Sequence, residues 1–107
     1  MSQALPRIIK RRAEINQVIQ QGEKRRAKYL VAFVQSSSEN GLGFCVLVGS
    51  KIKKAVKRNR IKRLLKEIVR KNRHPLRIDG GIVLLYSFGS TEVSYTELEV
   101  DFKDLFL

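Results

Sequence analysis

The residues best suited to do chemistry in this sequence are basic, and they are crowded into one stretch. Residues 51–74 hold twelve Lys or Arg and one acid, Glu67, which gives this segment a charge of +11. Phosphodiesters carry one charge each along a strand, so such a row can neutralise several of them and release their counterions. Asn59 lies within the row, and its amide can hydrogen-bond a base edge, a ribose hydroxyl or a hydrated metal. The segment therefore predicts a nucleic-acid surface, and a merely solvated helix face is the alternative.

Other parts of the chain differ sharply in charge. Residues 51–57, Lys-Ile-Lys-Lys-Ala-Val-Lys, lead from a strand into a helix N-terminus, where phosphate can bind, but they lack the glycines of a GxxxxGK loop. Residues 1–28 hold eight basic residues, and these form either flexible charged ends or an RNA-contacting arm. Residues 79–107 hold six acids and one base, so we do not expect the C-terminal part to meet a polyanion.

Protein-borne catalysis has few candidate residues. The chain has one histidine, His74, and one cysteine, Cys45, so we expect neither a zinc site nor an internal disulfide. Glu67 is the only acid in the basic segment, so no carboxylate cluster is expected to position metal ions there. A free-standing nuclease is therefore disfavoured, and we expect no small-molecule substrate.

Aromatic side chains offer a second kind of contact, because they can stack on unpaired bases. Tyr29 and Phe33 are four residues apart in one predicted strand, which places them on the same sheet face. Tyr29 opens that strand beside Lys28, so it is the better stacking candidate, with core packing as the alternative. For Phe44 and Tyr86 core packing is favoured.

The whole chain fits one domain, residues 1–107. Hydrophobic residues make up 43% of it, and the net charge is +12. A domain with that excess repels itself when compact, so a polyanionic partner is the natural explanation. The longest apolar stretches, residues 44–48 and 82–86, are far too short to span a membrane, and no secretory signal is apparent. We expect a cytoplasmic protein with no membrane partner.

Hydrophobic periodicity predicts three helices. They cover residues 11–21, closed by Gly22, then 55–73, and a last helix opened by the capping box Ser-Tyr-Thr-Glu at 94–97. In the middle helix four apolar residues form one arc: Ile61, Leu64, Leu65 and Ile68. The opposite arc collects polar and basic residues: Lys62, Arg73, Lys66, Asn59, Arg70, Arg63 and Arg60.

Three strands are predicted, over residues 29–35, 42–49 and 82–88. A turn at Asn40-Gly41 favours pairing of the first two as an antiparallel hairpin. The order is then α-β-β-α-β-α, an α+β sandwich with helices packed on a small mixed sheet.

Residues 55–65, Ala-Val-Lys-Arg-Asn-Arg-Ile-Lys-Arg-Leu-Leu, resemble the signature of the bacterial ribonuclease P protein component. The basic N-terminus and the order of the elements fit as well, so the resemblance covers nearly the whole chain. Two places depart from the family pattern. Ser50 and Lys53 stand where the family usually has lysine and glycine, and Ile15 and Ile19 stand where its first helix commonly has phenylalanine.

This resemblance implies a subunit of the endoribonuclease that removes the 5′ leader from precursor tRNA. Its partners would be the ribonuclease P RNA subunit and precursor tRNA; the RNA would be the catalyst and would hold Mg²⁺, and the protein would have no catalytic or metal-binding residue. A structural RNA binder, such as a small ribosomal protein, is the alternative that composition favours equally. The family fold also implies a left-handed β-α-β crossover, against the general rule of right-handed connections.

The expected RNA-binding residues lie on the signature helix, its lead-in and the N-terminal arm: Lys51, Lys54, Lys57, Arg58, Asn59, Arg60, Lys62, Arg63, Lys66, Arg70, Arg11 and Arg12. The leader is expected in a groove lined by Ile15, Ile19, Tyr29 and Phe33. Lys51 and Lys54 are expected near the leader phosphates.

The signature helix is expected to divide its residues between solvent and core. Arg58 and Arg60 should face solvent, so that either can be replaced without loss of the fold. Ile61 and Leu65 should face the core, so that a charge at either position unfolds the domain.

Overall fold

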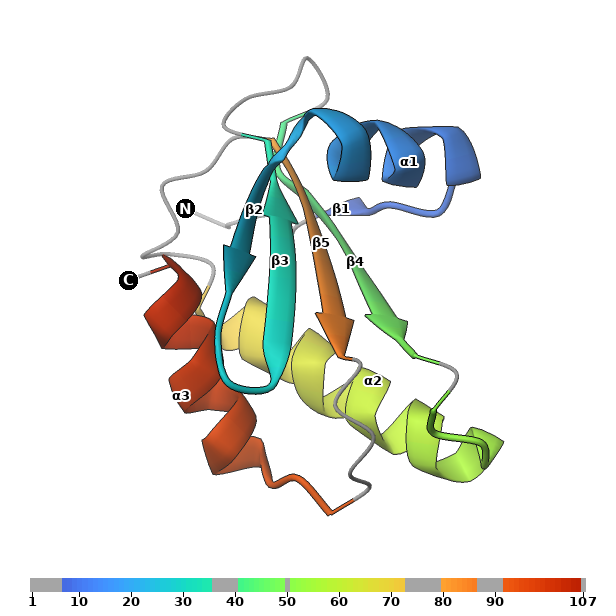
Figure 1. Cartoon of the computed structure of the whole chain (residues 1–107), viewed down its shortest axis with the longest axis vertical. Helices are drawn as coiled ribbons and strands as arrows, with labels where there is room; N and C mark the ends of the chain where they lie inside the picture. The colour runs from blue at the N-terminus through green and yellow to red at the C-terminus, as the bar shows by residue number, and fades with distance from the viewer. Residues whose placement is uncertain (1–6, 36–40, 50, 73–79, 87–91, 107) are drawn as a thin grey trace, which may run out of the picture.

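The computed structural model describes residues 7–35, 41–49, 51–72, 80–86 and 92–106. These residues form a five-stranded sheet of order β1-β4-β5-β3-β2 with three helices (Figure 1). The strands are β1 (Arg7–Ile8), β2 (Glu23–Arg26), β3 (Leu30–Val34), β4 (Gly43–Val48) and β5 (Gly81–Tyr86). The helices are α1 (Arg12–Gln21), α2 (Ala55–Lys71) and α3 (Tyr95–Phe106). The predicted α+β class is confirmed, and so is the mixed sheet, because β4 pairs in parallel with β1 and β5 while β3 runs antiparallel to β2 and β5.

The predicted hairpin of residues 29–35 with residues 42–49 is wrong, because these segments contain β3 and β4, which are not neighbours in the sheet. β5 lies between β3 and β4, and Asn40 of the expected turn falls outside the described residues. The physical reason is the composition of β5, whose residues are almost all buried. A strand that is apolar on both faces is most stable at the centre of a sheet with both faces covered.

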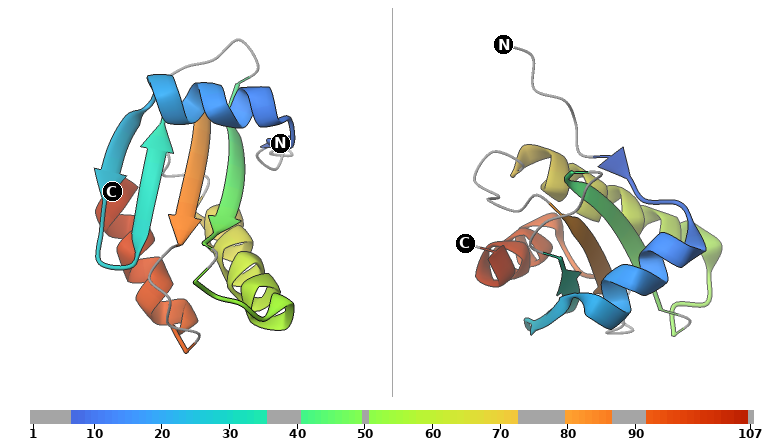
Figure 2. Two further views of the ribbon diagram at one scale, coloured as in Figure 1. Left: turned by 45° about the vertical axis from the view of Figure 1, so that its right-hand side comes forward. Right: turned by 90° about the horizontal axis from the view of Figure 1, so that it is seen from above.

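The connection from β4 through α2 to β5 has the left-handed sense that the family resemblance implies. β4 and β5 run parallel, and in Figure 1 both point downward with β5 to the left of β4. The chain passes from one strand to the other through α2, which lies behind the sheet in that view; Figure 2 shows the same arrangement from above. The general preference for right-handed connections is therefore overruled in this fold.

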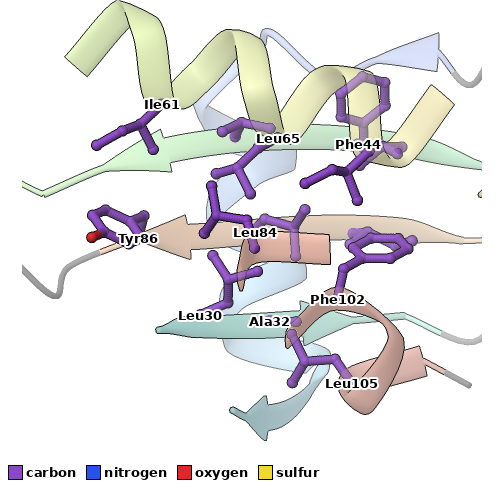
Figure 3. Packing of buried hydrophobic residues seen from close by; sticks show 14 of the residues in the cluster. Leu30, Ala32, Phe44, Ile61, Leu65, Leu84, Tyr86, Phe102 and Leu105 are labelled. Atoms are coloured by element: carbon purple, nitrogen blue, oxygen red, sulfur yellow. The ribbon is translucent and has the colours of Figure 1, made fainter. Parts of the chain in front are cut away.

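The two faces of the sheet are covered unequally. α2 and α3 pack on one face, and α1 crosses only one end of the other (Figure 2). Under α2 and α3 lies the main core, where Leu30, Leu84 and Tyr86 of the sheet meet Leu65 and Phe102 of the helices (Figure 3). A smaller cluster forms under α1. Because successive strand residues point to opposite faces, each of the three strands β3, β4 and β5 contributes to both clusters.

The helix ends follow the signals in the sequence. Gly22 caps α1, and a Cβ atom at this position would lie 2.5 Å from the Val18 carbonyl oxygen, so the close approach needs glycine. The capping box of α3 is confirmed, because the Glu97 amide donates to Ser94 Oγ at 3.1 Å and the Ser94 amide donates to Glu97 Oε1 at 3.0 Å. α2 begins at Ala55, as predicted.

Two strands escaped the sequence analysis, so the predicted element order was incomplete. β1 has two residues, and β2 is Glu-Lys-Arg-Arg, which has no apolar residue to mark a strand. The order among the described residues is β-α-β-β-β-α-β-α. Residues 87 and 88 of the last predicted strand lie outside the described residues, as does His74.

Candidate nucleic-acid interface

The basic face of α2 is held in place by an apolar face of the same helix. Ile61, Leu65 and Ile68 are fully buried at 0% exposure, which confirms the predicted core arc. Opposite them, most of the predicted RNA-binding residues are exposed: Lys51, Lys54, Lys57, Asn59, Arg63, Lys66 and Arg70. Because the apolar arc holds the helix on the sheet, the opposite side presents a fixed row of donors with the spacing of an α-helix.

Two arginines of the signature are placed otherwise than the sequence predicted. Arg58 is half-buried, and its Nη1 donates to the carbonyl oxygens of Ile52 at 2.8 Å and Lys53 at 2.7 Å. Arg60 is also half-buried, and its Nη2 donates to the Val93 carbonyl oxygen at 3.1 Å. The expectation that both face solvent without a structural role is wrong. A long arginine stem can reach from the rim of a helix face to neighbouring backbone.

The far end of α2 carries a local ion pair. Arg70 pairs with Glu67 one turn earlier, and its Nε donates to Glu67 Oε2 at 3.1 Å. This hydrogen bond holds the pKa of the Glu67 carboxyl below its usual value. Glu67 therefore offsets part of the charge of Arg70, which makes the first half of α2 the more positive half.

The open half of the other sheet face forms a shallow apolar floor. Strand register places Val31, Leu85 and Leu47 side by side on β3, β5 and β4, and all three are half-buried. Phe33 lies one step further along β3, toward α1. Ile15 and Ile19 of α1 pack with Phe33 and Leu47 around the small cluster under α1. Three of the four predicted groove residues are thus brought together here: Ile15, Ile19 and Phe33.

Basic side chains stand along the β2 edge of this floor. On β2, Lys24 pairs with Phe33 and Arg26 pairs with Val31, so both belong to the floor's face and both are exposed. Burial raises the pKa of the Cys45 thiol on β4, and the positive charges of Lys62 and Lys66 of α2 oppose that rise. Cys45 is a small core residue, as predicted.

Tyr29, the fourth predicted groove residue, lies on the opposite face. It precedes β3, where the alternation of the strand does not yet apply, and it packs against the main core. Its hydroxyl donates to Glu97 Oε2 at 2.7 Å, and its amide donates to the Asp101 carboxylate. The prediction that Tyr29 shares a face with Phe33 is therefore wrong, because α3 binds the tyrosine through both its backbone and its side chain.

The N-terminal basic residues form a separate patch at the start of α1. Arg11 and Arg12 are exposed, and a hollow of about 370 Å³ is lined by Arg7, Ile8, Lys10, Arg11 and Glu14. Arg7 Nη2 donates to Glu14 Oε2 at 2.7 Å and Nη1 donates to Oε1 at 3.1 Å, which fastens β1 to α1. This bidentate pair holds the pKa of the Glu14 carboxyl below its usual value.

Two kinds of feature are missing from the part of the chain that the structure describes. Its residues include no group of three or more His, Cys, Asp or Glu side chains placed to hold a metal ion. Within the same ranges, no helix has both the length and the apolar character needed to cross a membrane.

Comparison with known proteins decides the family. Residues 6–107 match the family model for ribonuclease P. This chain belongs to the ribonuclease P protein family. It is 33% identical over 96 residues to the ribonuclease P protein component of Natranaerobius thermophilus, covering 88% of this chain and 82% of that protein. It is 34% identical over 99 residues to that of Clostridium kluyveri, covering 91% and 88%.

Solved structures of ribonuclease P proteins share the fold. The Staphylococcus aureus protein superposes with a TM-score of 0.80 at 16% identity, covering 92% of this chain and 90% of that one. The Thermotoga maritima protein also superposes with a TM-score of 0.80, at 20% identity, covering 92% of this chain and 93% of that one. The chain is thus a protein component of the ribonucleoprotein that processes the 5′ end of tRNA and part of an endoribonuclease holoenzyme; a small ribosomal protein is not favoured.

Within this ribonuclease P protein, the sequence analysis missed several groove residues. For Lys24 and Arg26 the sequence leaves charged ends and an RNA-contacting arm as equal alternatives, and Val31, Leu47 and Leu85 are not singled out. Residues 24–26 are three consecutive basic residues, and which of them share a face becomes readable only once β2 is known to be a strand.

Proposed function

We propose that the chain is one RNA-binding domain with two surfaces. The exposed basic row of α2 and its lead-in binds the RNA subunit, with Arg11 and Arg12 as a second contact. The apolar floor, with the basic residues of β2 along its edge, binds the single-stranded 5′ leader of precursor tRNA. Lys51 and Lys54 lie at the N-terminal end of α2, beyond the end of β4 and far from α1 (Figure 1), so we assign them to the RNA subunit first.

The leader assignment is carried by one observation, the half-open sheet face. A single strand needs an apolar platform for its bases and positive charge along its backbone. Val31, Leu85 and Leu47 supply the first, with Phe33 as the aromatic member, and Lys24 and Arg26 of β2 supply the second. Apolar side chains can contact the exposed faces of unpaired bases, which a duplex keeps stacked inside, so the floor favours single-stranded RNA.

The chemistry of cleavage belongs to the RNA in this proposal. Mg²⁺ held by the RNA subunit would supply the activated water, and the protein's own residues would bind and orient the leader. This division is supported by the chemistry of the two surfaces, whose residues are cations, amides and apolar side chains. The holoenzyme would work in the cytoplasm, where tRNA is made.

Replacing one aromatic ring on each sheet face tests the proposal. Stacking on an aromatic side chain contributes about 1–3 kcal/mol per base, so Phe33→Ala in the holoenzyme should weaken precursor binding by roughly tenfold and leave mature tRNA binding unchanged. Tyr29→Ala is the matched control, because it removes a ring of similar size from the opposite face. Thermal melts of both variants establish that they fold. Equal effects of the two substitutions on precursor affinity would contradict the placement of the leader.

A further inference from the structure

Residues 51–54, which we call the lead-in, come directly before α2 and carry three exposed lysines, Lys51, Lys53 and Lys54, around one buried residue. That residue is Ile52, which is 1% exposed and belongs to the main core. The Ile52 amide donates to the Gly49 carbonyl oxygen at 3.2 Å, and Gly49 is tied in turn to β5, because its amide donates to the Tyr86 carbonyl oxygen at 2.8 Å. The Lys54 carbonyl oxygen also accepts from the amides of Lys57 and Arg58, both at 3.1 Å, so backbone bonds tie both ends of a segment whose side chains repel one another.

Arg58 supplies two more bonds to the same segment. Its Nη1 donates to the carbonyl oxygens of Ile52 and Lys53, at 2.8 and 2.7 Å. Hydrogen bonds from a charged donor are stronger than neutral ones, and these two bonds bridge five and six residues back from the first turn of α2. The guanidinium thus clamps the lead-in onto the helix that follows it.

Apart from these two hydrogen bonds, an arginine at position 58 is unfavourable for the stability of α2. A cation in the first turn opposes the helix dipole, and α2 has no acidic residue in that turn to offset it. Lys54, at the N-cap, makes no capping hydrogen bond with its side chain. The protein's own stability would be served better by an acid or a neutral cap here. Because Arg58 hydrogen-bonds the carbonyl oxygens of the lead-in, its benefit lies in the position of that segment rather than in the stability of the helix.

We propose that Arg58 is a positioning residue for RNA binding, which holds Lys51, Lys53 and Lys54 where they meet successive phosphates of the RNA subunit. This inference rests on the proposed function, since it assumes that these lysines bind RNA. Without the clamp each lysine must be ordered at the moment of binding, and that entropy is subtracted from the affinity. When Arg58 holds the lead-in, the free-energy cost of keeping the three lysines close together is already included in the folding of the protein.

The proposal separates Arg58 from Arg63 on the same helix. Arg63 is exposed and lies on the side opposite the core, so it is a direct phosphate contact. Neutralising a direct contact lowers the slope of log K against log salt by about 0.7–0.9. Removing a positioning residue weakens binding by a constant factor and leaves the slope unchanged, because the same lysines still neutralise the same phosphates in the complex.

The experiment compares Arg58→Met with Arg63→Met, reading affinity for a bacterial ribonuclease P RNA across a salt series and amide exchange of Ile52, Lys57 and Arg58. We expect Arg58→Met to speed exchange at these amides and to weaken binding roughly tenfold at every salt concentration, a loss of about 1.4 kcal/mol. Arg63→Met should leave exchange unchanged and flatten the salt dependence. Arg58→Lys, which keeps a donor within reach of one carbonyl, should give intermediate exchange and intermediate affinity.

Several outcomes would overturn the inference. A flattened salt slope for Arg58→Met with unchanged exchange would make Arg58 a direct phosphate contact. Faster exchange with unchanged affinity would make the clamp purely structural. If Arg58→Met does not fold, Arg58→Lys decides between the same alternatives. Wild-type protein that binds the RNA without steep salt dependence would instead refute the proposed function, so the two failures are distinguishable.

Discussion

Neighbouring arginines on β2 offer the sharpest test of the groove, because they carry the same charge to opposite faces of the sheet. Arg26 pairs with Val31 and lies on the face of the apolar floor. Arg25 pairs with Ala32 and lies on the other face, where its Nη1 donates to the Leu105 carbonyl oxygen at 3.0 Å and its guanidinium lies 5.7 Å from the centre of the Phe106 ring. Replacing each in turn by methionine keeps the stem and removes the charge.

The expected size of the effect follows from counterion release. Loss of one phosphate contact on a single strand lowers the magnitude of the salt slope by about 0.7. At about 0.15 M salt this corresponds to a loss of affinity of roughly fourfold, or about 0.8 kcal/mol. We therefore expect Arg26→Met to weaken precursor tRNA binding by that factor. With Lys24→Met added, the loss should be roughly fourteenfold and the slope change about 1.4.

Arg25→Met should behave in the opposite way. It should lower the melting temperature, because the bond to α3 and the contact with the Phe106 ring are lost, and it should leave the salt slope unchanged. The assay is holoenzyme affinity for precursor and mature tRNA at four or more salt concentrations, with thermal melts of each protein. If Arg25→Met and Arg26→Met change the precursor slope equally, or if mature tRNA loses as much affinity as precursor, the groove does not bind the leader.

Two further predictions concern stability. Ile61→Asp places a charge at a position of 0% exposure and should destabilise the fold by more than about 3 kcal/mol, whereas Arg63→Asp should melt within a few degrees of wild type; similar melts would mean that the faces of α2 are wrongly assigned. The Arg7–Glu14 pair lowers the folded-state pKa of Glu14 below its usual value of 4.5, so its stabilisation is present above that pH and is lost as pH falls through the folded-state pKa. Denaturant melts from pH 6 to pH 3 should show a smaller acid loss for Glu14→Gln than for wild type, and identical losses would refute the role of this pair.

The sequence predicted the elements whose information is local. α2 repeats its apolar residues with the helical period from Ile61 to Ile68, so its start at Ala55 and its buried residues Ile61 and Leu65 follow without knowledge of the fold, although it ends at Lys71 rather than at residue 73. The capping box at Ser94 and Glu97 is likewise a signal read within four residues. The left-handed crossover does not follow from local patterns, and only the resemblance to the family predicts it.

The errors arose where the deciding contact is distant in sequence. Tyr29 was placed by the alternation of β3, but it is bound by Glu97 and Asp101 of α3, about seventy residues away. β3 and β4 look like a hairpin from the residues between them, yet β5, from beyond α2, takes the central place. Arg58 lies one turn before Ile61, at the rim of the apolar arc, where the helical pattern does not decide between solvent and backbone.

The sheet distributes the charged side chains of its strands between its two faces. Counts of charged residues along the sequence therefore do not show on which face the charge lies. On β2 the three consecutive basic residues Lys24, Arg25 and Arg26 read as one basic run, but the two-residue period of the strand sends the middle one toward α3 and the outer two toward the apolar floor. On that face the charge of Arg25 is partly offset by its ion pair with Glu23, two residues earlier on the same strand. The floor receives the basic side chains of Lys24 and Arg26 from β2. α3 carries most of the C-terminal acids, so an RNA strand that approaches α3 meets carboxylates, whereas one that approaches the floor meets the cations of β2. The same alternation that builds the sheet therefore also sets which face RNA binds.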